Sequence, residues 1–408
     1  MNKKVTIRDI KAFAIAPSAD RPVDLVVVKV LTSEDGLYGL GCATFTQRWQ
    51  AVVTALETNL KPILLGRDVN DIEDLWESAI SSGYWRRGPV LNNALAGVDE
   101  ALWDIKGKLA GMPVYSLLGG KCREGALVYR HAGGENMDEL EKSIRSFTEQ
   151  GFRCVRVGCG EVEGAYDYPM VKPENAKEGA YFTNRGAAEK AAEMFRQLNE
   201  RFKGEDVQFC YDIHEHMSPI EALQFAKAVE PYHLFFLEDA LSPENSEWYK
   251  LIRQQSYVPI AMGELFTNPA EYKRLIQDGM IDYIRCHITM IGGITPAKKL
   301  AVFAEMNGVK TAWHGPHDIS PVGVTAQLHI DVNVPNFGIQ EFYGFSKEER
   351  ELFPGCPETR DGYLYPNDKP GLGIDFDEKL AKECPAQFRE HAHDWFLTRL
   401  PDGTPVRP

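Results

Sequence analysis

The stretch Phe209-Cys210-Tyr211-Asp212-Ile213-His214-Glu215-His216 has the pattern of a buried β-strand that ends in an acid and a histidine. Two more acids follow at equal spacing, because 26 residues separate Asp212 from Glu238 and another 26 separate Glu238 from Glu264. Each acid closes an apolar run. A strand, a helix and their connections take roughly 30 residues in a β/α barrel. The spacing therefore predicts three consecutive barrel strands, each with a carboxylate at its C-terminal end, where the active sites of such barrels lie.

Three carboxylates that converge on one point repel one another, and burying them without a counter-charge is costly. A divalent cation removes this cost, and hard oxygen ligands that leave room for water or substrate oxygens suit Mg²⁺. A single acid in such a position would be read as a solvated loop residue or a helix cap. Three acids at equal spacing, each after an apolar strand, instead predict a Mg²⁺ site formed by Asp212, Glu238 and Glu264.

The chain of 408 residues carries a formal net charge of −14. This charge disfavours nucleic acid and anionic membrane surfaces as partners, but it allows a small anionic substrate held by a metal and local arginines. No apolar run approaches the ~20 residues needed to span a bilayer, and no apolar signal region stands at the start. The eight cysteines include no Cys-x-x-Cys pair. We therefore expect a cytoplasmic protein with its thiols reduced.

Residues 1–120 have the pattern of an α+β domain. Strand-like alternation and a Glu34-Asp35-Gly36 turn signal predict three strands, at residues 5–16, 24–31 and 37–43. Helical periodicity then predicts helices at residues 56–65, 72–80 and 91–109.

Eight further strand-like segments predict a barrel over residues 121–345. They are residues 126–131, 152–157, 207–211, 234–237, 258–263, 281–286, 309–314 and 337–342. Helical segments lie between most of them, and eight strands over about 220 residues fit one β/α barrel. The connection at 158–184 is long and rich in Gly, Tyr and Pro, which predicts a lid. Residues 346–408 are predicted to return to the N-terminal domain and to end in a short helix around 385–397.

Several motifs resemble those of a known family. They are Tyr84-Trp85-Arg86-Arg87-Gly88-Pro89, Ala101-Leu102-Trp103-Asp104-Ile105-Lys106-Gly107-Lys108, Leu117-Leu118-Gly119-Gly120, Tyr211-Asp212-Ile213-His214-Glu215-His216 and Trp313-His314-Gly315-Pro316. Over nearly its whole length the chain resembles the enolase superfamily and, within it, the mannonate dehydratase group. The resemblance implies an α/β fold, in which an N-terminal capping domain covers a (β/α)7β TIM-like barrel. It also implies one Mg²⁺, and abstraction of the proton α to a sugar-acid carboxylate.

Removal of that proton builds negative charge on the carboxylate, which a metal that holds the carboxylate stabilises. Many superfamily members carry Lys-x-Lys at the end of the second strand, where this chain has Cys154-Val155-Arg156. Arginine cannot lose its proton in a protein, so Arg156 is not the base. The resemblance implies that a loop tyrosine takes this role beside the arginine, and ungapped counting gives Tyr168, with Tyr166 as the alternative. Such a tyrosine needs a neighbouring cation, because its unperturbed pKa is about 10.

His214 lies two residues beyond Asp212, so alternation along a strand should place both side chains on the same strand-end face. Histidine donates protons effectively near neutral pH, and we predict that His214 protonates the departing 3-hydroxyl group. The other histidines in these motifs, His216, His287 and His317, are expected to be surface or packing residues. The resemblance further implies substrate contacts from other strand ends, and a pairing of the Arg285 guanidinium with the substrate carboxylate. These contacts come from His131, Arg285, His314, Asp318 and Glu341.

The chain departs from the group after the third strand. Where Leu-Asn-Gly-Arg-Glu is expected, Phe45-Thr46-Gln47-Arg48-Trp49 stands. Thr46, the predicted substrate contact, lacks the amide donor of asparagine. A site that hydrogen-bonds its substrate strongly rejects a substrate with which that bond cannot form, so loss of the asparagine amide is expected to change which substrate is accepted. The resemblance also associates Pro316 with slow members of the group.

Three hypotheses follow. The first is a dehydratase, of low activity, that converts D-mannonate or D-gluconate to 2-keto-3-deoxy-D-gluconate. The second, favoured by Thr46, is the same α-proton chemistry on another acid sugar. The third is a non-catalytic binding or regulatory homologue, against which the carboxylate triad, Arg156 and His214 argue. The resemblance also implies a homo-oligomer.

Overall fold

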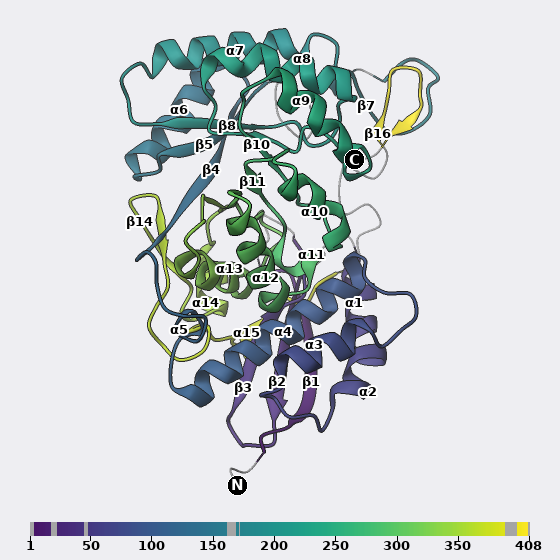
Figure 1. Cartoon of the computed structure of the whole chain (residues 1–408), viewed down its shortest axis with the longest axis vertical. Helices are drawn as coiled ribbons and strands as arrows, with labels where there is room; N and C mark the ends of the chain where they lie inside the picture. The colour runs from purple at the N-terminus through teal and green to yellow at the C-terminus, as the bar shows by residue number, and fades with distance from the viewer. Residues whose placement is uncertain are drawn as a thin grey trace.

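The computed structural model describes residues 4–17, 23–44, 48–160, 172–387 and 398–406, together with the backbone of Pro169 and Met170. A sheet with its helices forms the N-terminal part, and a barrel of parallel strands ringed by helices lies above it (Figure 1). This is the predicted (β/α)7β barrel with an α+β cap. Among the described residues, no helix is long and apolar enough to cross a membrane.

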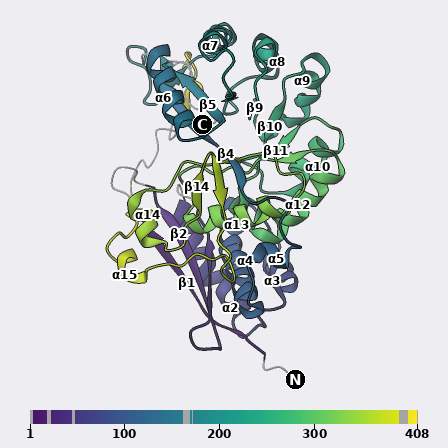
Figure 2. The ribbon, with the colours of Figure 1, turned by 90° about the vertical axis from the view of Figure 1, so that its left-hand side faces the viewer.

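The cap is an antiparallel sheet in the order β1-β2-β3, with helices packed on one face (Figure 2). Its strands are β1 (Ile7–Ile15), β2 (Leu25–Thr32) and β3 (Tyr38–Cys42). Its helical segments are α1 (Trp49–Ala55), a π-helical turn (Leu56–Leu60), α2 (Lys61–Leu64), α3 (Ile72–Ile80), α4 (Pro89–Ala110) and α5 (Val114–Leu117). The predicted strands and helices are present, except that the helix predicted at 56–65 begins as the π-helical turn.

The edge strand β3 packs against α4 at backbone contact distance. A Cβ atom added to Gly41 would lie 2.0 Å from the carbonyl oxygen of Gly97 on α4. Two buried acids of α4 accept hydrogen bonds from β3, Glu100 from the Cys42 amide at 2.7 Å and Asp104 from the Leu40 amide at 3.0 Å. The acids thus satisfy edge amides that would otherwise be buried without partners.

Replacing Gly41 by alanine is expected to destabilise the protein by more than about 3 kcal/mol, because the new methyl group meets backbone atoms that cannot rotate away. Urea denaturation measures this change. The matched control is Gly83→Ala, since an added Cβ at Gly83 has its nearest neighbour at 3.5 Å. The control should alter stability by no more than about 0.5 kcal/mol. Equal stability of the two variants would contradict the close β3–α4 packing.

The eight predicted barrel strands are present and parallel. They are β4 (Ala126–Gly134), β5 (Cys154–Cys159), β8 (Gln208–Asp212), β9 (Leu237–Glu238), β10 (Ile260–Met262), β11 (Tyr283–Ile284), β12 (Lys310–Thr311) and β13 (Gln340–Glu341). Strand β13 pairs with β4, and a parallel bridge joins Thr311 to Phe337. The strands therefore close into a barrel, in which all C-terminal ends lie at one mouth.

Helices surround the barrel and its interior is filled with side chains. The helices are α6 (Met137–Glu149), α7 (Ala187–Arg201), α8 (Pro219–Val229), α9 (Tyr249–Gln255), α10 (Pro269–Gln277), α11 (Ile288–Ile291), α12 (Ile294–Met306) and α13 (Pro321–Asn333). Inside, an apolar layer is formed by Tyr129, Cys154, Cys210, Phe236, Ala261, Ala312 and Ile339. This layer is the floor beneath the polar strand ends. Cys42, Cys154, Cys210 and Cys286 are buried.

The C-terminal segment contacts the cap. It contains α14 (Lys347–Leu352), the hairpin β14 (Glu358–Arg360) and β15 (Tyr363–Tyr365), and α15 (Glu378–Ala381) beside the sheet (Figure 2). Lys29 of β2 and Glu378 of α15 form an ion pair at 2.6 Å. The domain borders at residues 120 and 345 stay predictions, and most of the helix predicted at 385–397 lies outside the described residues.

A second small sheet joins distant parts of the chain, in the order β17-β16-β7-β6. Its strands are β6 (Pro169–Met170), β7 (Ala180–Phe182), β16 (Thr398–Arg399) and β17 (Pro405–Val406). Strand β16 pairs in parallel with β7 at one side of the barrel mouth (Figure 1). The sequence patterns predicted none of this pairing.

Candidate active site

Four predicted site acids lie at the mouth of the barrel. Asp212 is the last residue of β8, Glu238 the last of β9 and Glu341 the last of β13, while Glu264 follows β10 by two residues. Their side chains are buried, and the most exposed of them, Glu264, is 8% exposed. The parallel strands bring these acids together because their carboxyl ends meet at one edge.

Among the described residues, three carboxylates lie close enough together to hold one metal ion. Oxygen atoms of Asp212, Glu238 and Asp239 lie within 4.8 Å of one another. The third predicted acid, Glu264, instead pairs with Arg285 at 2.7 Å, and the His314 Nδ1 atom lies 3.2 Å from it. The structure thus joins two of the three predicted metal ligands and adds Asp239 beside them.

Arg285 lies at the centre of the acidic cluster and is fully buried. Its guanidinium group contacts four carboxylates, at 2.7–2.8 Å: Glu238, Asp239, Glu264 and Glu341. It also donates to the Tyr129 hydroxyl at 3.1 Å. These contacts neutralise protein carboxylates, a different task from the predicted pairing with a substrate carboxylate.

Arg156, in the middle of β5, contacts the other side of the cluster. One nitrogen donates to Asp212 at 2.7 Å and to Glu238 at 3.0 Å, and the second lies 3.1 Å from the His131 Nδ1 atom. His131 in turn contacts Glu341 through Nε2 at 2.7 Å. Arg156 is therefore a fixed cation beside the cluster, in agreement with the expectation that it is not the base.

The cluster has more negative than positive groups. Five carboxylates, of Asp212, Glu238, Asp239, Glu264 and Glu341, face two guanidiniums and His314. Burial and the nearby Glu238 raise the pKa of Asp212 well above its usual range. Burial alone would lower the pKa of His314, but the nearby carboxylates of Glu264 and Glu341 outweigh burial and raise that pKa to about 9. With all five acids ionised and His314 charged, two negative charges remain, and a divalent oxygen-seeking cation matches this excess.

His214 reaches the cluster by a backbone turn that strand alternation does not describe. Strand β8 ends at Asp212, and His214 and Glu215 have φ angles of 54° and 69°, in the left-handed region that non-glycine residues seldom adopt. The His214 amide donates to the Asp212 carboxylate at 2.7 Å. Its Nε2 atom lies 3.6 Å from Glu264, so the imidazole faces the acids as predicted, although for a different reason.

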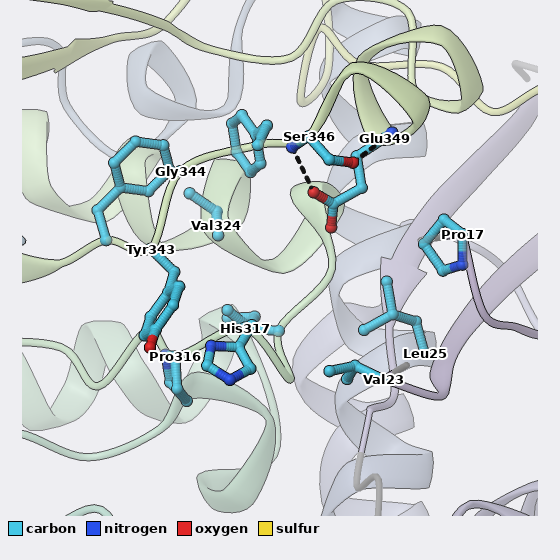
Figure 3. A pocket seen from close by; sticks show the side chains of 14 residues that line it. Pro17, Val23, Leu25, Pro316, His317, Val324, Tyr343, Gly344, Ser346 and Glu349 are labelled. Atoms are coloured by element: carbon cyan, nitrogen blue, oxygen red, sulfur yellow. Dashed lines mark hydrogen bonds between the residues drawn. The ribbon is translucent and has the colours of Figure 1, made fainter. Parts of the chain in front are cut away.

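Two cavities open at the mouth. One, of about 160 Å³, is lined by His131, Arg156, Asp212 and Tyr343, among others. The other, of about 30 Å³, lies where the barrel meets the cap, with Pro316 and His317 on the barrel side and Val23 and Leu25 on the cap side (Figure 3). Both parts of the fold thus supply the rim of the site.

Three predicted site residues, Thr46, Tyr168 and its alternative Tyr166, lie outside the described residues. Two residues that are not among the predicted site residues also lie at the site. Asp239 follows Glu238 directly in the sequence. Strand alternation predicts that neighbouring side chains point in opposite directions, so it gave no reason to expect Asp239 beside Glu238. His287, expected at the surface or in packing, is 4% exposed and its ring centroid lies 5.4 Å from that of His314.

Two family models match the chain. Residues 4–119 match the N-terminal domain of mandelate racemase and muconate lactonizing enzyme, and residues 139–380 match the enolase C-terminal domain-like model. These matches confirm the predicted resemblance to the enolase superfamily. They also agree with the cap and barrel described above.

Comparison with individual relatives identifies the family within the superfamily. A D-galactonate dehydratase family member from Enterocloster bolteae is 55% identical and covers 99% of both chains, and one from Musicola paradisiaca is 51% identical over 99% of this chain and 100% of its own. A solved structure of an enolase from Pantoea ananatis, with bound D-gluconate and Mg, is 50% identical, covers 99% of this chain and 100% of that chain, and superposes with a TM-score of 0.93. The chain therefore belongs to the enolase superfamily and, within it, to the D-galactonate dehydratase family of hydro-lyases.

Proposed function

We propose that this protein is a Mg²⁺-dependent dehydratase of D-gluconate or D-mannonate that produces 2-keto-3-deoxy-D-gluconate. The observation that carries the proposal is the buried cluster of five carboxylates, which outnumber the two guanidinium groups and His314 beside them and so suit a divalent cation. The Pantoea ananatis relative, with its bound D-gluconate and Mg, supports both the metal and the class of substrate. The family name makes D-galactonate a further substrate to test.

Asp212, Glu238 and Glu264 would hold the metal, with Asp239 as the neighbouring acid. When bound, Mg²⁺ supplies positive charge beside the substrate carboxylate, where negative charge builds as the α-proton leaves. The low pKa of the Glu264 carboxyl group suits it to bind a metal. Burial alone would raise its pKa, but His314, His214 and Arg285 outweigh burial and lower the pKa to about 2.

The α-proton needs a base on the side of the site near Arg156. We assign this role to Tyr168, with Tyr166 as the alternative. Arg156 supports the assignment because its charge favours a phenolate nearby. The guanidinium also keeps Asp212 and Glu238 in place, so a substitution of Arg156 would disturb both the base and the acidic cluster.

His214 would give its proton to the departing 3-hydroxyl group. Its imidazole faces Glu264, and loss of water from C3 then leaves an enol that rearranges to the 2-keto product. His131, His314, Asp318 and Glu341 are proposed substrate contacts. In this proposal Arg285 acts by neutralising Glu238, Glu264 and Glu341.

The test is a panel of six-carbon acid sugars incubated with the protein and Mg²⁺, with 2-keto-3-deoxy acids measured as semicarbazones. The proposal expects product from D-gluconate or D-mannonate, at a low rate, and none after the metal is removed with EDTA. Product from D-galactonate alone would replace the proposed substrate. A homo-oligomeric assembly and a cytoplasmic location remain predictions from the sequence.

A further inference from the structure

His287 lies at the mouth beside Asp318, a proposed substrate contact, and the proposed reaction gives His287 no role. His287 precedes α11 and caps its N-terminus. It is 4% exposed, and its ring adjoins that of His314. Asp318 lies in the connection between β12 and α13, and its side chain is 33% exposed.

The hydrogen bonds of His287 determine which ring nitrogen carries the proton. Its Nδ1 atom accepts from the Thr289 amide at 3.2 Å and lies 2.8 Å from the Thr289 hydroxyl. A backbone amide only donates, so Nδ1 is unprotonated and the neutral ring carries its proton on Nε2. Burial, followed by the charge of His314, lowers the pKa of His287 to about 3, which keeps the ring neutral. The Nε2–H group is therefore a hydrogen-bond donor near neutral pH.

This donor and the Asp318 carboxylate are too far apart to form a hydrogen bond with each other. Nε2 lies 3.9 Å from the Asp318 Oδ1 atom, beyond hydrogen-bond distance. Within the part of the chain that the structure describes, Oδ1 is buried without a hydrogen-bond partner. A single oxygen atom about 2.8 Å from each could accept from Nε2–H and donate to Oδ1. Only a hydroxyl group or a water molecule can do both.

We propose that His287 joins Asp318, already a proposed substrate contact, in binding one hydroxyl group of the substrate, on a carbon beyond the two that react. The proposal rests on the proposed function for its substrate class, an acid sugar with a chain of hydroxyl groups. Among the described residues, neither His287 nor Asp318 forms an ion pair or hydrogen bond with the proposed metal ligands Asp212, Glu238 and Glu264, so the pair is free to bind another part of the substrate.

The pair is also connected to the cap. The Thr289 hydroxyl group, beside His287, lies 3.4 Å from the carbonyl oxygen of Thr44, which follows β3. Residue 46, where the chain departs from the family pattern, is two positions further along the sequence. A hydroxyl held by His287 and Asp318 would thus lie on the cap side of the mouth, where specificity can change without altering the acids.

The experiment compares His287→Phe with the wild type on the preferred acid sugar and on its 4-deoxy, 5-deoxy and 6-deoxy analogues. Phenylalanine keeps a flat ring and removes the donor. The wild type should prefer the parent sugar to one analogue by about 100-fold in kcat/KM, because the pair is left unsatisfied without that hydroxyl. In His287→Phe that preference should fall to within about 5-fold, while preference over the other analogues stays unchanged.

Two control variants test whether the change in preference is specific to the lost N–H donor of His287. His233→Gln, at an exposed histidine on the outside of the barrel, should keep the wild-type preferences. His287→Gln, which restores an N–H donor, should recover part of the preference if His287→Phe folds poorly. If His287→Phe lowers kcat/KM equally for the parent and all analogues, or leaves the wild-type preferences intact, His287 only packs or holds a structural water and the proposal fails.

Failure of the proposed function is detected separately. If the wild type turns over none of the sugars, calorimetric dissociation constants for the same four acids, measured with Mg²⁺, replace kcat/KM. A preference for one hydroxyl that depends on His287 would support the pair without dehydration. Equal affinities, or no binding, would overturn it.

Discussion

Replacing Asp212 by asparagine will reduce kcat/KM for the acid-sugar substrate by about 1000-fold or more. The substitution removes one of the charges that would hold the metal, and stabilisation of the developing charge at the substrate carboxylate is worth several kcal/mol. Asp212 has two further partners, the His214 amide at 2.7 Å and Arg156 at 2.7 Å. The change therefore weakens the metal site and also disturbs the turn that orients His214.

The fold should survive this substitution. Burial and Glu238 raise the pKa of Asp212, which means that its ionised form is unfavourable when no metal is bound. Without Mg²⁺ the melting temperature of Asp212→Asn should therefore match or exceed that of the wild type. Added Mg²⁺ should raise the melting temperature of the wild type only, since a ligand stabilises a protein that binds it. The control Asp278→Asn, at the exposed end of α10, should behave as the wild type in both assays.

The same assays identify the third metal ligand. Asp239 accepts from the Gly263 amide at 2.9 Å and from Arg285 at 2.8 Å, so both of its oxygens already have protein partners. We expect Glu264→Gln to abolish the stabilisation by Mg²⁺ and Asp239→Asn to weaken it only partly. The opposite order would assign the metal to the group of Asp212, Glu238 and Asp239.

Replacing His214 by asparagine will separate the two halves of the reaction. We expect dehydration to fall by about 100- to 10,000-fold, the usual contribution of a positioned general acid. The base and the metal ligands are unchanged, so exchange of the C2 hydrogen with solvent should persist. Asparagine also tolerates the left-handed backbone of position 214, where φ is 54°, so the turn should be kept.

The control for this variant is His233→Asn. His233 is exposed and has nearly the same backbone conformation, with φ of 53°, but lies at the end of a 3-10 turn on the outside of the barrel. It should retain wild-type rates. If His214→Asn loses C2 exchange together with dehydration, His214 is either the base itself or required to position the metal ligands, and its role as the proton donor is wrong.

The barrel and its acids could be predicted because their signals are local. Each barrel strand is a short apolar run, and the equal spacing of Asp212, Glu238 and Glu264 repeats the strand–helix unit. The strands of the cap could be predicted in the same way, from the alternation of apolar and polar residues. Such patterns depend only on which residues neighbour one another along the chain.

The rest of the site depends on contacts that the chain makes only after it folds. Arg285 neutralises four carboxylates from three other strand ends, and no spacing in the sequence indicates that it lies among them. Asp239 and His214 are positioned by turns with positive φ angles that interrupt strand alternation. The sequence indicates only a surface or packing role for His287, because a lone histidine gives no sign of the Thr289 amide that fixes its tautomer.

The most direct measurement is a proton NMR spectrum of the purified protein with Mg²⁺ and either D-gluconate or D-mannonate in D₂O. The account predicts a 2-keto-3-deoxy product that forms only with the metal and does not form with Asp212→Asn. With His214→Asn, it predicts loss of the C2 proton signal with little elimination. A wild-type protein that binds Mg²⁺ yet neither exchanges the C2 hydrogen nor eliminates water from either sugar would contradict the account.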